Sequence, residues 1–186
     1  MRPEYAQSAL TGPAAPLVWA RADLVDLMEA LVPGEGLLVG SFSRALALVH
    51  SECVECGYVR PREFRVNAGP LSSYVAAPGG RTAYLSELRA GDEVLVVDAE
   101  GRARAAAVAR VKVEKRPITL LEMRSECGQE LAVGLQNAET VRVVTPGGGA
   151  LSVSVAAPGD KVLARVEARE VARHTGIAIE ENASER

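Results

Sequence analysis

The sequence predicts a mainly β (α+β) fold, in which an antiparallel, barrel-like sheet carries an internal pseudo-repeat and few short helices. From Phe64 onward, short Val-rich runs alternate with turn sequences rich in Gly, Pro and Asp. Runs of this kind, at this spacing, are typical of antiparallel strands that close on themselves. The chain is 48% hydrophobic but only 4% aromatic, so its core must be built mainly from Val, Leu and Ala. With 186 residues, it is long enough to bury such a core.

The N-terminal part of the chain combines a loose segment with a helical pattern. Residues 1–16 carry two turn signals and no hydrophobic period, so we expect a flexible arm over residues 1–20. A single β-rich domain is expected over residues 21–186. Apolar side chains at helical spacing predict a short helix over 22–32 that ends at Pro33-Gly34.

The remaining elements are expected to be strands. The apolar stretch 36–52 predicts two strands joined by a turn at Gly40-Ser41. Further Val-rich runs predict strands at 94–98, 105–114, 118–123, 130–136, 140–144, 151–155 and 161–167.

An internal repeat relates the segments of about 48–114 and 120–181. The turn Pro78-Gly79-Gly80 returns 68 residues later as Pro146-Gly147-Gly148, and Gly91-Asp92 returns at the same offset as Gly159-Asp160. A duplicated β unit buries one face against its twin, which would bring equivalent turns into related positions. Chance recurrence of Pro-Gly and Gly-Asp turns in a β protein is the alternative.

Charge and hydropathy exclude several classes of partner. The net charge is -3 and no continuous Lys/Arg run exists, so we expect no nucleic-acid partner. No apolar run approaches the roughly 20 residues that span a bilayer, so we expect no membrane association. The N-terminus lacks a basic-then-apolar signal pattern, which predicts a cytoplasmic protein.

His50 and Glu52 form a candidate metal-binding pair. Residues i and i+2 of a strand point to the same face, and an imidazole with a carboxylate suits Mn²⁺, Fe²⁺ or Zn²⁺. The second histidine, His174, lies six residues before Glu180, and these two side chains could complete the ligand set. On the residues alone, a surface salt bridge is the alternative.

The three cysteines allow two rival interpretations. Cys53 and Cys56 have the spacing of a zinc knuckle and, with His50 and Cys127, could hold structural zinc. A redox pair at the same two cysteines is disfavoured, because no βαβ pattern surrounds them. Ordinary reduced thiols are the alternative to both.

Cationic and amide side chains cluster near predicted strand ends. Arg62, Arg65, Lys115 and Arg116 suit a carboxylate or phosphate ligand, with a solvated basic edge as the alternative. Gln136 and Asn137 either satisfy buried backbone groups or bind ligand hydroxyls. No Gly-rich phosphate loop of a recognised kind is present.

Six ordered blocks resemble the archaeal-type 3-dehydroquinate synthase family (dehydroquinate synthase II). They are "PGEGLLVGSFSRALALVHSE", "YVRPREFRVNAGPLSSYV", "PGGRTAYLSELRAGDEVLVVDAEG", "VARVKVEKRPITLLE", "LQNAETVRVVTP" and "ARHTGIAIEE". The resemblance covers about residues 21–182 and corresponds to the C-terminal half of the usual family protein. It also argues for a strand rather than a helix near residues 22–32.

The resemblance implies an enzyme that cyclises a linear seven-carbon (C7) amino-keto acid. The archaeal type uses NAD to deaminate this substrate oxidatively before closing the ring to 3-dehydroquinate. A bacterial branch makes 3-amino-4-hydroxybenzoate by elimination and aromatisation, with a divalent metal such as Mn²⁺ and without NAD. We favour the second, lyase-like reaction on a phosphorylated C7 acid, with NAD-dependent oxidation as the alternative.

The matching blocks imply roles for individual residues. His50, Glu52, His174 and Glu180 would bind the metal, which would polarise the substrate ketone as a Lewis acid. Glu114, Lys115 and Glu139 are the catalytic candidates, with a carboxylate moving protons. The expected substrate-binding residues are Arg62, Arg65, Asn67, Arg116, Gln136 and Asn137.

The resemblance also bears on partners. We expect a homo-oligomer, because a chain of this length would expose apolar surface where the other half of the family protein packs. A separate chain carrying the N-terminal half is a further expected partner. A non-catalytic subunit, or one half of a split enzyme, is therefore the alternative to a complete enzyme.

Overall fold

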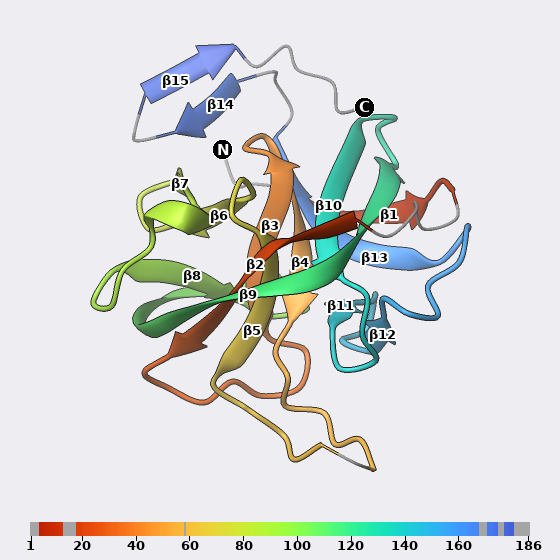
Figure 1. Cartoon of the computed structure of the whole chain (residues 1–186). Helices are drawn as coiled ribbons and strands as arrows, with labels where there is room; N and C mark the ends of the chain where they lie inside the picture. Colours follow the sequence, from red (N-terminus) through yellow and green to blue (C-terminus); the bar gives the residue numbers. More distant parts are fainter. Residues whose placement is uncertain (1–3, 13–17, 58, 168–170, 175–176, 181–186) are drawn as a thin grey trace.

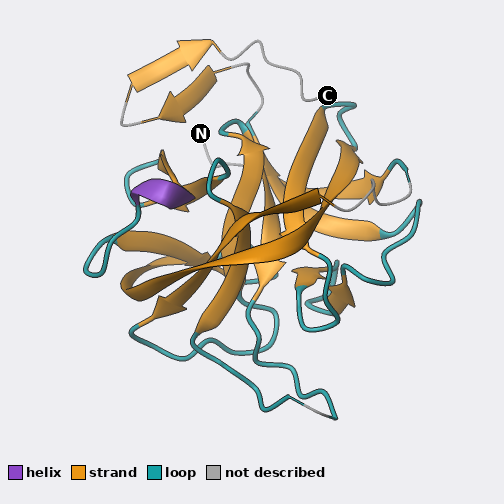
Figure 2. Cartoon of the chain, in the orientation of Figure 1, coloured by secondary structure: helices purple, strands orange, loops and turns teal. Residues whose placement is uncertain are grey.

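The computed structural model describes residues 4–12, 18–57, 59–167, 171–174 and 177–180; side chains are described for residues 7–12, 18–57 and 59–167. The elements are almost all strands (Figures 1 and 2). In chain order they are β1 Glu4–Leu10, β2 Val18–Leu27, β3 Gly36–Phe42, β4 Ala45–His50, β5 Arg65–Pro70, β6 Tyr74–Ala77, β7 Arg81–Tyr84, the 3₁₀ helix η1 Leu85–Glu87, β8 Glu93–Val97, β9 Ala103–Ser125, β10 Glu130–Gln136, β11 Arg142–Val144, β12 Ala150–Ser152, β13 Lys161–Val166, β14 Val171–His174 and β15 Ile177–Glu180. The mainly β prediction is confirmed.

Six of the strands form a closed ring. The order is β3-β4-β13-β1-β9-β8, and β8 pairs back onto β3. All these pairings are antiparallel, as the sequence predicted. The remaining strands attach to this ring, among them β2 and β10 on β9.

The interior of the ring is aliphatic. Strands of the ring and strand β2 contribute side chains that are almost completely buried, including Val25, Val39, Val49 and Val108. The core contains few aromatic rings, so it is filled by small β-branched and Leu side chains that pack well on a pleated surface.

Strand β9 organises the region that concerns function. It runs for 23 residues and pairs in turn with β8, β2, β10 and β1. The sequence predicted two strands here, at 105–114 and 118–123. They are one strand, because Pro117 lies opposite Trp19 of β2 and its carbonyl accepts a hydrogen bond from the Asn137 backbone N–H (2.9 Å).

The helix predicted over 22–32 is wrong, because β2 occupies Val18–Leu27. Residues 22–27 are buried on both faces of the strand, so their apolar side chains show no simple alternation. Over so short a segment, apolar residues on both faces of a strand can fall at the i, i+3, i+4 spacing of a helix. The strand that the family resemblance implied is the observed element.

The segment expected to be a flexible arm contains a paired strand. Strand β1 lies antiparallel to β13 and β9 and completes the ring. The end of this strand also bonds to the turn before β13, since the Leu10 backbone N–H donates to the Asp160 carbonyl (3.0 Å).

The turns that defined the repeat adopt matching backbone conformations. Gly79 and Gly80 have φ of 79° and 71°, and Gly147 and Gly148 have φ of 84° and 82°. Each Gly-Asp turn precedes a ring strand, β8 or β13. In each, the Asp side chain accepts a hydrogen bond from the backbone N–H three residues earlier, Arg89 to Asp92 and Ala157 to Asp160. The repeat stays a prediction that these parallels support.

Candidate functional site

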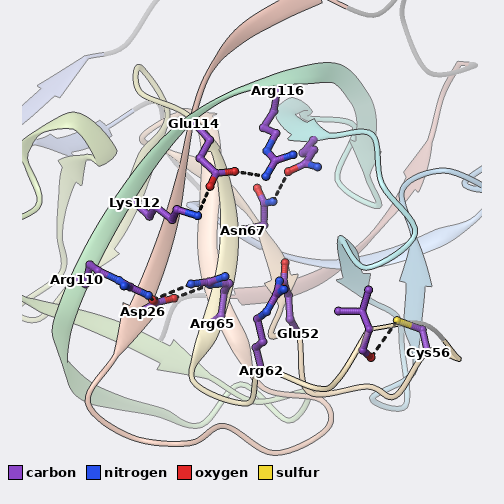
Figure 3. Close-up of polar contacts among 12 residues, drawn as sticks. Asp26, Glu52, Cys56, Arg62, Arg65, Asn67, Arg110, Lys112, Glu114 and Arg116 are labelled. Carbon is purple, nitrogen blue, oxygen red and sulfur yellow. Dashed lines mark hydrogen bonds and ion pairs between the residues drawn. The ribbon is translucent and has the colours of Figure 1, made fainter.

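A polar face extends across three neighbouring strands, β5, β2 and β9 (Figure 3). Side chains of directly paired residues lie on the same face of a sheet, so the register defines rows. From one end, the rows are Arg65·Asp26·Arg110, Asn67·Leu24·Lys112, Ala22·Glu114 and Ala20·Arg116. The opposite face of these strands carries Val25 and Val66 and belongs to the core.

A β-bulge brings β5 into this arrangement. Asp23 pairs with Gly69, but Leu24 pairs with Asn67, so Ala68 is an extra residue on β5. Without the bulge, Val66 and Ala68 would share a face with Asp26 and Leu24. The bulge therefore turns Arg65 and Asn67 onto the polar face.

Asp26 lies between two arginines, and we call Asp26, Arg65 and Arg110 the Asp26 pole. Arg65 bonds both carboxylate oxygens (Nε to Oδ1, 2.6 Å; Nη2 to Oδ2, 2.9 Å), and Arg110 bonds Oδ2 through Nε (3.0 Å) and Nη2 (2.5 Å). The Asp26 and Arg65 side chains are buried, whereas that of Arg110 is 61% exposed. Burial by itself would raise the pKa of Asp26, but the hydrogen bonds from Arg65 and Arg110 outweigh burial and lower it. Asp26 is therefore a carboxylate at neutral pH.

A second cluster lies farther along β9, and we call Lys112, Glu114 and Arg116 the Glu114 pole. Lys112 bonds Oε1 of Glu114, and Arg116 bonds Oε2. The hydrogen bond from Lys112 is the largest cause of the lowered pKa of Glu114, and that from Arg116 adds to it. Glu114 is thus held as an anion that fixes two partly exposed cations.

Two polar atoms beside the Glu114 pole are buried and have no partner. Asn67 is 2% exposed and donates through Nδ2 to Oε1 of Gln136 (2.6 Å), at the end of β10. Its Oδ1 accepts no hydrogen bond, and Arg116 Nε donates none. An orphaned acceptor and an orphaned donor in one cluster match a ligand that supplies a hydroxyl or ammonium group and an oxygen.

Glu52 and Arg62 close the other side of the polar face. Arg62 Nη1 donates to Glu52 Oε2 (3.1 Å), and the two residues also form an isolated backbone bridge across the segment 52–62. Glu52 is 6% exposed, and this burial raises its pKa although Arg62 and Arg65 oppose the change. Among the carboxylates of this face, Glu52 has the raised pKa that suits proton donation.

His50 has a different environment from the one expected of a metal ligand. Its Nε2 accepts from the Gly34 backbone N–H (2.9 Å), which leaves Nδ1 as the donor to the Ser51 carbonyl (2.6 Å). The ring is 2% exposed, and burial is the largest cause of its lowered pKa. The neutral imidazole therefore bridges two backbone segments.

The described residues do not fit a metal ion. Both ring nitrogens of His50 are engaged and Glu52 is paired with Arg62. Within the ranges whose side chains the structure describes, no three His, Cys, Asp or Glu side chains are placed to hold one ion. That includes the zinc set of His50, Cys53, Cys56 and Cys127, and none of these three cysteines forms a disulfide.

The other predicted ligands, His174 and Glu180, have side chains outside the described residues. Their strands β14 and β15 form a hairpin whose first strand pairs with β7. In Figure 1 this hairpin and the 51–64 segment lie at opposite ends of the molecule.

The remaining predicted residues divide by the face or loop they occupy. Lys115 is exposed and pairs with Arg21 of β2, so it lies on the opposite face of β9 from Glu114 and Arg116. Asn137 and Glu139 follow β10 in a turn, where Asn137 is half-buried and Glu139 is exposed. The polar face thus brings together Glu52, Arg62, Arg65, Asn67, Glu114, Arg116 and Gln136.

Sequence reasoning missed three members of the polar face: Asp26, Arg110 and Lys112. A signal for two of them was present, because Arg110, Lys112, Glu114 and Arg116 alternate with other residues at the period of a strand face. Asp26 lies within residues 22–32, where the sequence predicts a helix and the structure has strand β2.

The polar face has a small net positive charge. The two poles hold four cations and two carboxylates, and Glu52 with Arg62 adds none. The cations are therefore ordered in advance by carboxylates, which suits a small anion with defined hydrogen-bonding groups.

Comparison with known proteins points to one family. Residues 18–186 match the 3-dehydroquinate synthase II C-terminal domain. The chain is similar to the 3-dehydroquinate synthases of Methanopyrus kandleri (52% identical over 163 residues, 87% of this chain and 40% of the relative) and Methanocaldococcus jannaschii (52% over 162 residues, 87% and 44%). That of Korarchaeum cryptofilum is 51% identical over 162 residues, 87% of this chain and 48% of the relative.

The chain spans less than half the length of these curated relatives. No solved structure matches it. Within the described part of the chain, no helix has the length and apolarity that a membrane crossing requires.

Proposed function

Because this chain belongs to the 3-dehydroquinate synthase II family, as its C-terminal domain, we propose that it binds and helps to cyclise a linear C7 amino-keto acid. The relatives named 3-dehydroquinate synthase support an enzyme of this type, and the polar face supports the location of its substrate site. The finer proposal is an elimination and aromatisation that retains the substrate nitrogen and yields a 3-amino-4-hydroxybenzoate-like product.

The observation that carries the proposal is the orphaned pair at the Glu114 pole. A buried amide oxygen without a donor costs about 1–3 kcal/mol, so a water molecule or a ligand group that donates to it is favoured. Asn67 Oδ1 would accept from a substrate hydroxyl or ammonium group, and Arg116 Nε would donate to a substrate oxygen. A polyhydroxylated amino-keto acid carries both kinds of group.

The residues of the polar face have distinct proposed roles. Arg62 and Arg116, both partly exposed, bind the anionic groups of the substrate, and Arg65 orders the site through Asp26. Asn67 with Gln136 orients the middle of the chain. Glu52 donates a proton to a leaving oxygen. Its raised pKa means that, at a given pH, a larger fraction of Glu52 is protonated than of an ordinary Glu side chain.

Glu114 is the proposed base rather than an acid. Its lowered pKa keeps it ionised and makes it a poor proton donor; the same shift makes it a weaker base than an ordinary Glu, so proton transfer from the substrate to Glu114 requires that its bonds to Lys112 and Arg116 loosen. Lys115 lies on the opposite face of β9, so in this proposal its side chain contacts a neighbouring chain or water rather than the substrate. Asn137 and Glu139 would act from the turn after β10.

A divalent metal remains part of the finer proposal, but no step is derived through it. His50 and Glu52 are engaged with other partners, so the ligands would have to come from His174, Glu180 or another chain. NAD-dependent oxidative deamination is the competing proposal, carried by the names of the relatives.

A non-catalytic role in a split enzyme is the second candidate function. The chain covers less than half of each of these relatives, and in this candidate function the portion that it does not match would supply the remaining residues of the active site. A separate chain that resembles their unmatched portion would then complete the active site.

The test combines this chain with the unmatched N-terminal portion of a full-length relative. The C7 amino-keto phosphate is supplied with Mn²⁺, with or without NAD, and product is followed by absorbance. We expect an aromatic amine without NAD, formed only when both chains are present if the enzyme is split. Turnover that requires NAD would replace the aromatisation proposal by the oxidative one.

Two variants locate the reaction on the polar face. Asn67→Ala is expected to lower kcat/KM by at least tenfold, because it removes the orphaned acceptor. Arg124→Gln is the matched control, since it alters an exposed ion pair of the same strand β9 away from the poles. Full activity of Asn67→Ala would exclude the polar face as the substrate site.

A further inference from the structure

The first residues of β2 and the facing part of β9 lie side by side in a two-stranded ribbon (Figure 1). Trp19 pairs with Pro117 and Arg21 with Lys115, and residues 18–21 are paired with no described strand other than β9. Residues 18–21 and 112–117 are exposed or half-buried, whereas β2 is buried from residue 22 to residue 27. The ribbon therefore leaves the core before it ends.

One side of this ribbon continues the core face of the sheet into solvent. Side chains alternate along a strand, so Trp19 and Arg21 point to the same side of β2 as Val25. Val25 is completely buried, whereas Trp19 is 64% exposed and Val113 of β9, on the same side, is 51% exposed. Trp is among the residues that dominate binding hot spots, so this surface suits a protein partner. We call the following residues the ribbon face: Trp19, Arg21, Val113, Lys115 and Pro117.

The boundary of the family domain lies at this ribbon. The match to the C-terminal domain begins at Val18, the neighbour of Trp19, and the chain covers 40% of the Methanopyrus kandleri relative. In such a relative, the portion that precedes the matched domain joins it at the start of the ribbon. An extended chain spans at most about 3.5 Å per residue, so that portion begins beside the ribbon face. In this chain, β1 pairs with β13 and β9, and Trp19 stays exposed.

From this geometry we infer that the ribbon face docks a protein domain of the kind that precedes the matched region in the relatives. The partner surface is apolar where it covers Trp19 and Val113, and it carries acidic side chains opposite Arg21 and Lys115. The docking surface rests on the split-enzyme form of the proposed function and identifies where the second component binds. It also gives Lys115, which faces away from the substrate site, a contact of its own.

The charge of the ribbon face favours this partner over a second copy of the chain. Its two charged side chains, Arg21 and Lys115, are exposed cations at paired positions. A two-fold dimer would bring the face against itself, and the cations of the two copies would repel each other. An acidic partner surface is attracted by the same cations. Self-association through Trp19 is therefore the weaker contact, and the docked domain should displace it.

The ribbon also links the docking surface to the polar face. Along β9, Glu114 and Arg116 alternate with Val113, Lys115 and Pro117, so the same stretch of backbone carries both surfaces. A domain packed on the ribbon face restricts the movement of this stretch and therefore of the Glu114 pole. Docking is thus expected to order the carboxylate and the arginine that the proposed reaction uses.

Trp19 reports directly on docking, because it is the only tryptophan of the chain. The full chain, labelled with 5-fluorotryptophan, gives one ¹⁹F resonance, which is followed as the unlabelled portion of the Methanopyrus kandleri relative that precedes its matched domain is added. We expect the resonance to shift and broaden, with saturation at a one-to-one ratio, and to lose its sensitivity to the exchange of H2O for D2O as the indole leaves water. A resonance that keeps its position and its solvent sensitivity would overturn the inference, and this comparison needs no variant to fold. Co-expression with the labelled chain replaces the titration if the added portion is insoluble by itself, and failure to copurify is the same negative result.

Variants at exposed positions assign the contact to the ribbon face. Trp19→Ser is expected to weaken binding at least about tenfold by calorimetry, because it removes the apolar anchor. Arg21→Glu is expected to weaken it roughly fivefold, and this loss should shrink as the ionic strength rises. Val155→Ser and Arg124→Glu are the matched controls, since Val155 is 69% exposed and Arg124 is 57% exposed outside the ribbon. Both controls should bind within about twofold of the parent chain.

An equal loss in Val155→Ser and Trp19→Ser would overturn the inference, because binding would then follow exposed apolar surface in general. A homo-oligomer that the added domain does not displace would assign the ribbon face to self-association and overturn it as well. Docking is measured without substrate, so the proposed reaction is tested separately. A one-to-one complex without turnover would reject the reaction and retain the docking surface. Turnover by this chain alone, with no complex, would reject the docking surface and retain the reaction.

Discussion

Replacement of Asp26 by Asn isolates the contribution of the Asp26 pole to stability. The Asp26 and Arg65 side chains are 4% and 9% exposed, so Asn leaves a buried guanidinium without its counterion. Breaking a buried ion pair by removing one partner costs about 3–5 kcal/mol. We expect about 3 kcal/mol, because the Asn amide oxygen still accepts one hydrogen bond and the exposed Arg110 moves into water.

Urea unfolding followed by circular dichroism measures this loss. With a slope near 2 kcal/mol/M, a loss of about 3 kcal/mol lowers the midpoint by roughly 1.5 M urea. Glu114→Gln is the matched control, since the partners of Glu114 are 50% and 41% exposed and an exposed pair contributes at most about 1 kcal/mol. The double variant Asp26→Leu with Arg65→Met should recover much of the loss, because no unpaired charge remains buried.

The pH dependence of the Asp26 contribution has a defined sign. The lowered pKa of Asp26 means that its stabilisation is complete above its unfolded-state pKa of 3.8 and is lost as the pH falls through its folded-state pKa. A loss in Asp26→Asn no larger than that in Glu114→Gln would refute the reasoning. A double variant as unstable as Asp26→Asn would show that the cost arises from packing rather than charge.

Three further predictions concern other parts of the fold. Burial without a partner raises the pKa of Asp23 to about 6. Stability therefore falls by about 3 kcal/mol as the pH rises from 3.8 through about 6 and Asp23 ionises. Asp23→Asn should remove this pH dependence of the free energy of unfolding, measured by urea titration from pH 4 to 8, and an unchanged dependence would contradict the prediction. Gly69→Ala should destabilise by more than 2 kcal/mol and reduce binding at the polar face, because φ is +96° and a Cβ would lie 2.2 Å from the Gly134 carbonyl oxygen; an unchanged urea midpoint would contradict this. Trp19 is 64% exposed, so a homo-oligomer measured by light scattering should dissociate in Trp19→Ser, and a monomeric parent protein would exclude this interface.

The sequence predicted the strands that are bounded by clear turns. Residues 130–136 were predicted as a strand and are β10, because Gly128 precedes them with a positive φ and a polar turn follows. The turn between β3 and β4 was misplaced by about three residues, since small residues at 40–41 continue strand β3. Helix and strand could not be distinguished at β2, where burial on both faces removed the alternation that identifies a strand.

The site was predictable only in part, for a related reason. Alternation within one strand assigns side chains to a face, so Glu114 and Arg116 could be grouped and Lys115 could have been excluded. The sequence of a single strand does not determine its register with the neighbouring strands. The rows that join Asp26 to both Arg65 and Arg110 depend on pairings between residues 39 and 84 positions apart.

His50 shows that residue types and spacing alone do not determine the role of a histidine. A His-x-Glu pair on a strand has the residue types and the spacing of a metal site, yet its ring nitrogens bond the Gly34 N–H and the Ser51 carbonyl. These backbone groups are supplied by the turn before β3 and by the next residue in the chain. A buried histidine with two backbone partners stabilises the fold, and its sequence context does not distinguish that role from metal binding.

The bulge at Ala68 of β5 links the fold to the proposed substrate site. It reverses which residues of β5 face outward, and so places Arg65 and Asn67 beside Asp26 rather than in the core. The carboxylates Asp26 and Glu114 then hold four mutually repelling cations in fixed positions before any ligand arrives. Such preorganisation lowers the entropic cost of binding a ligand, but the carboxylates that provide it also reduce the net positive charge of the site. The two carboxylates neutralise half of the charge of the four cations, so the fixed positions of the remaining guanidinium donors contribute to the selectivity of the proposed substrate site.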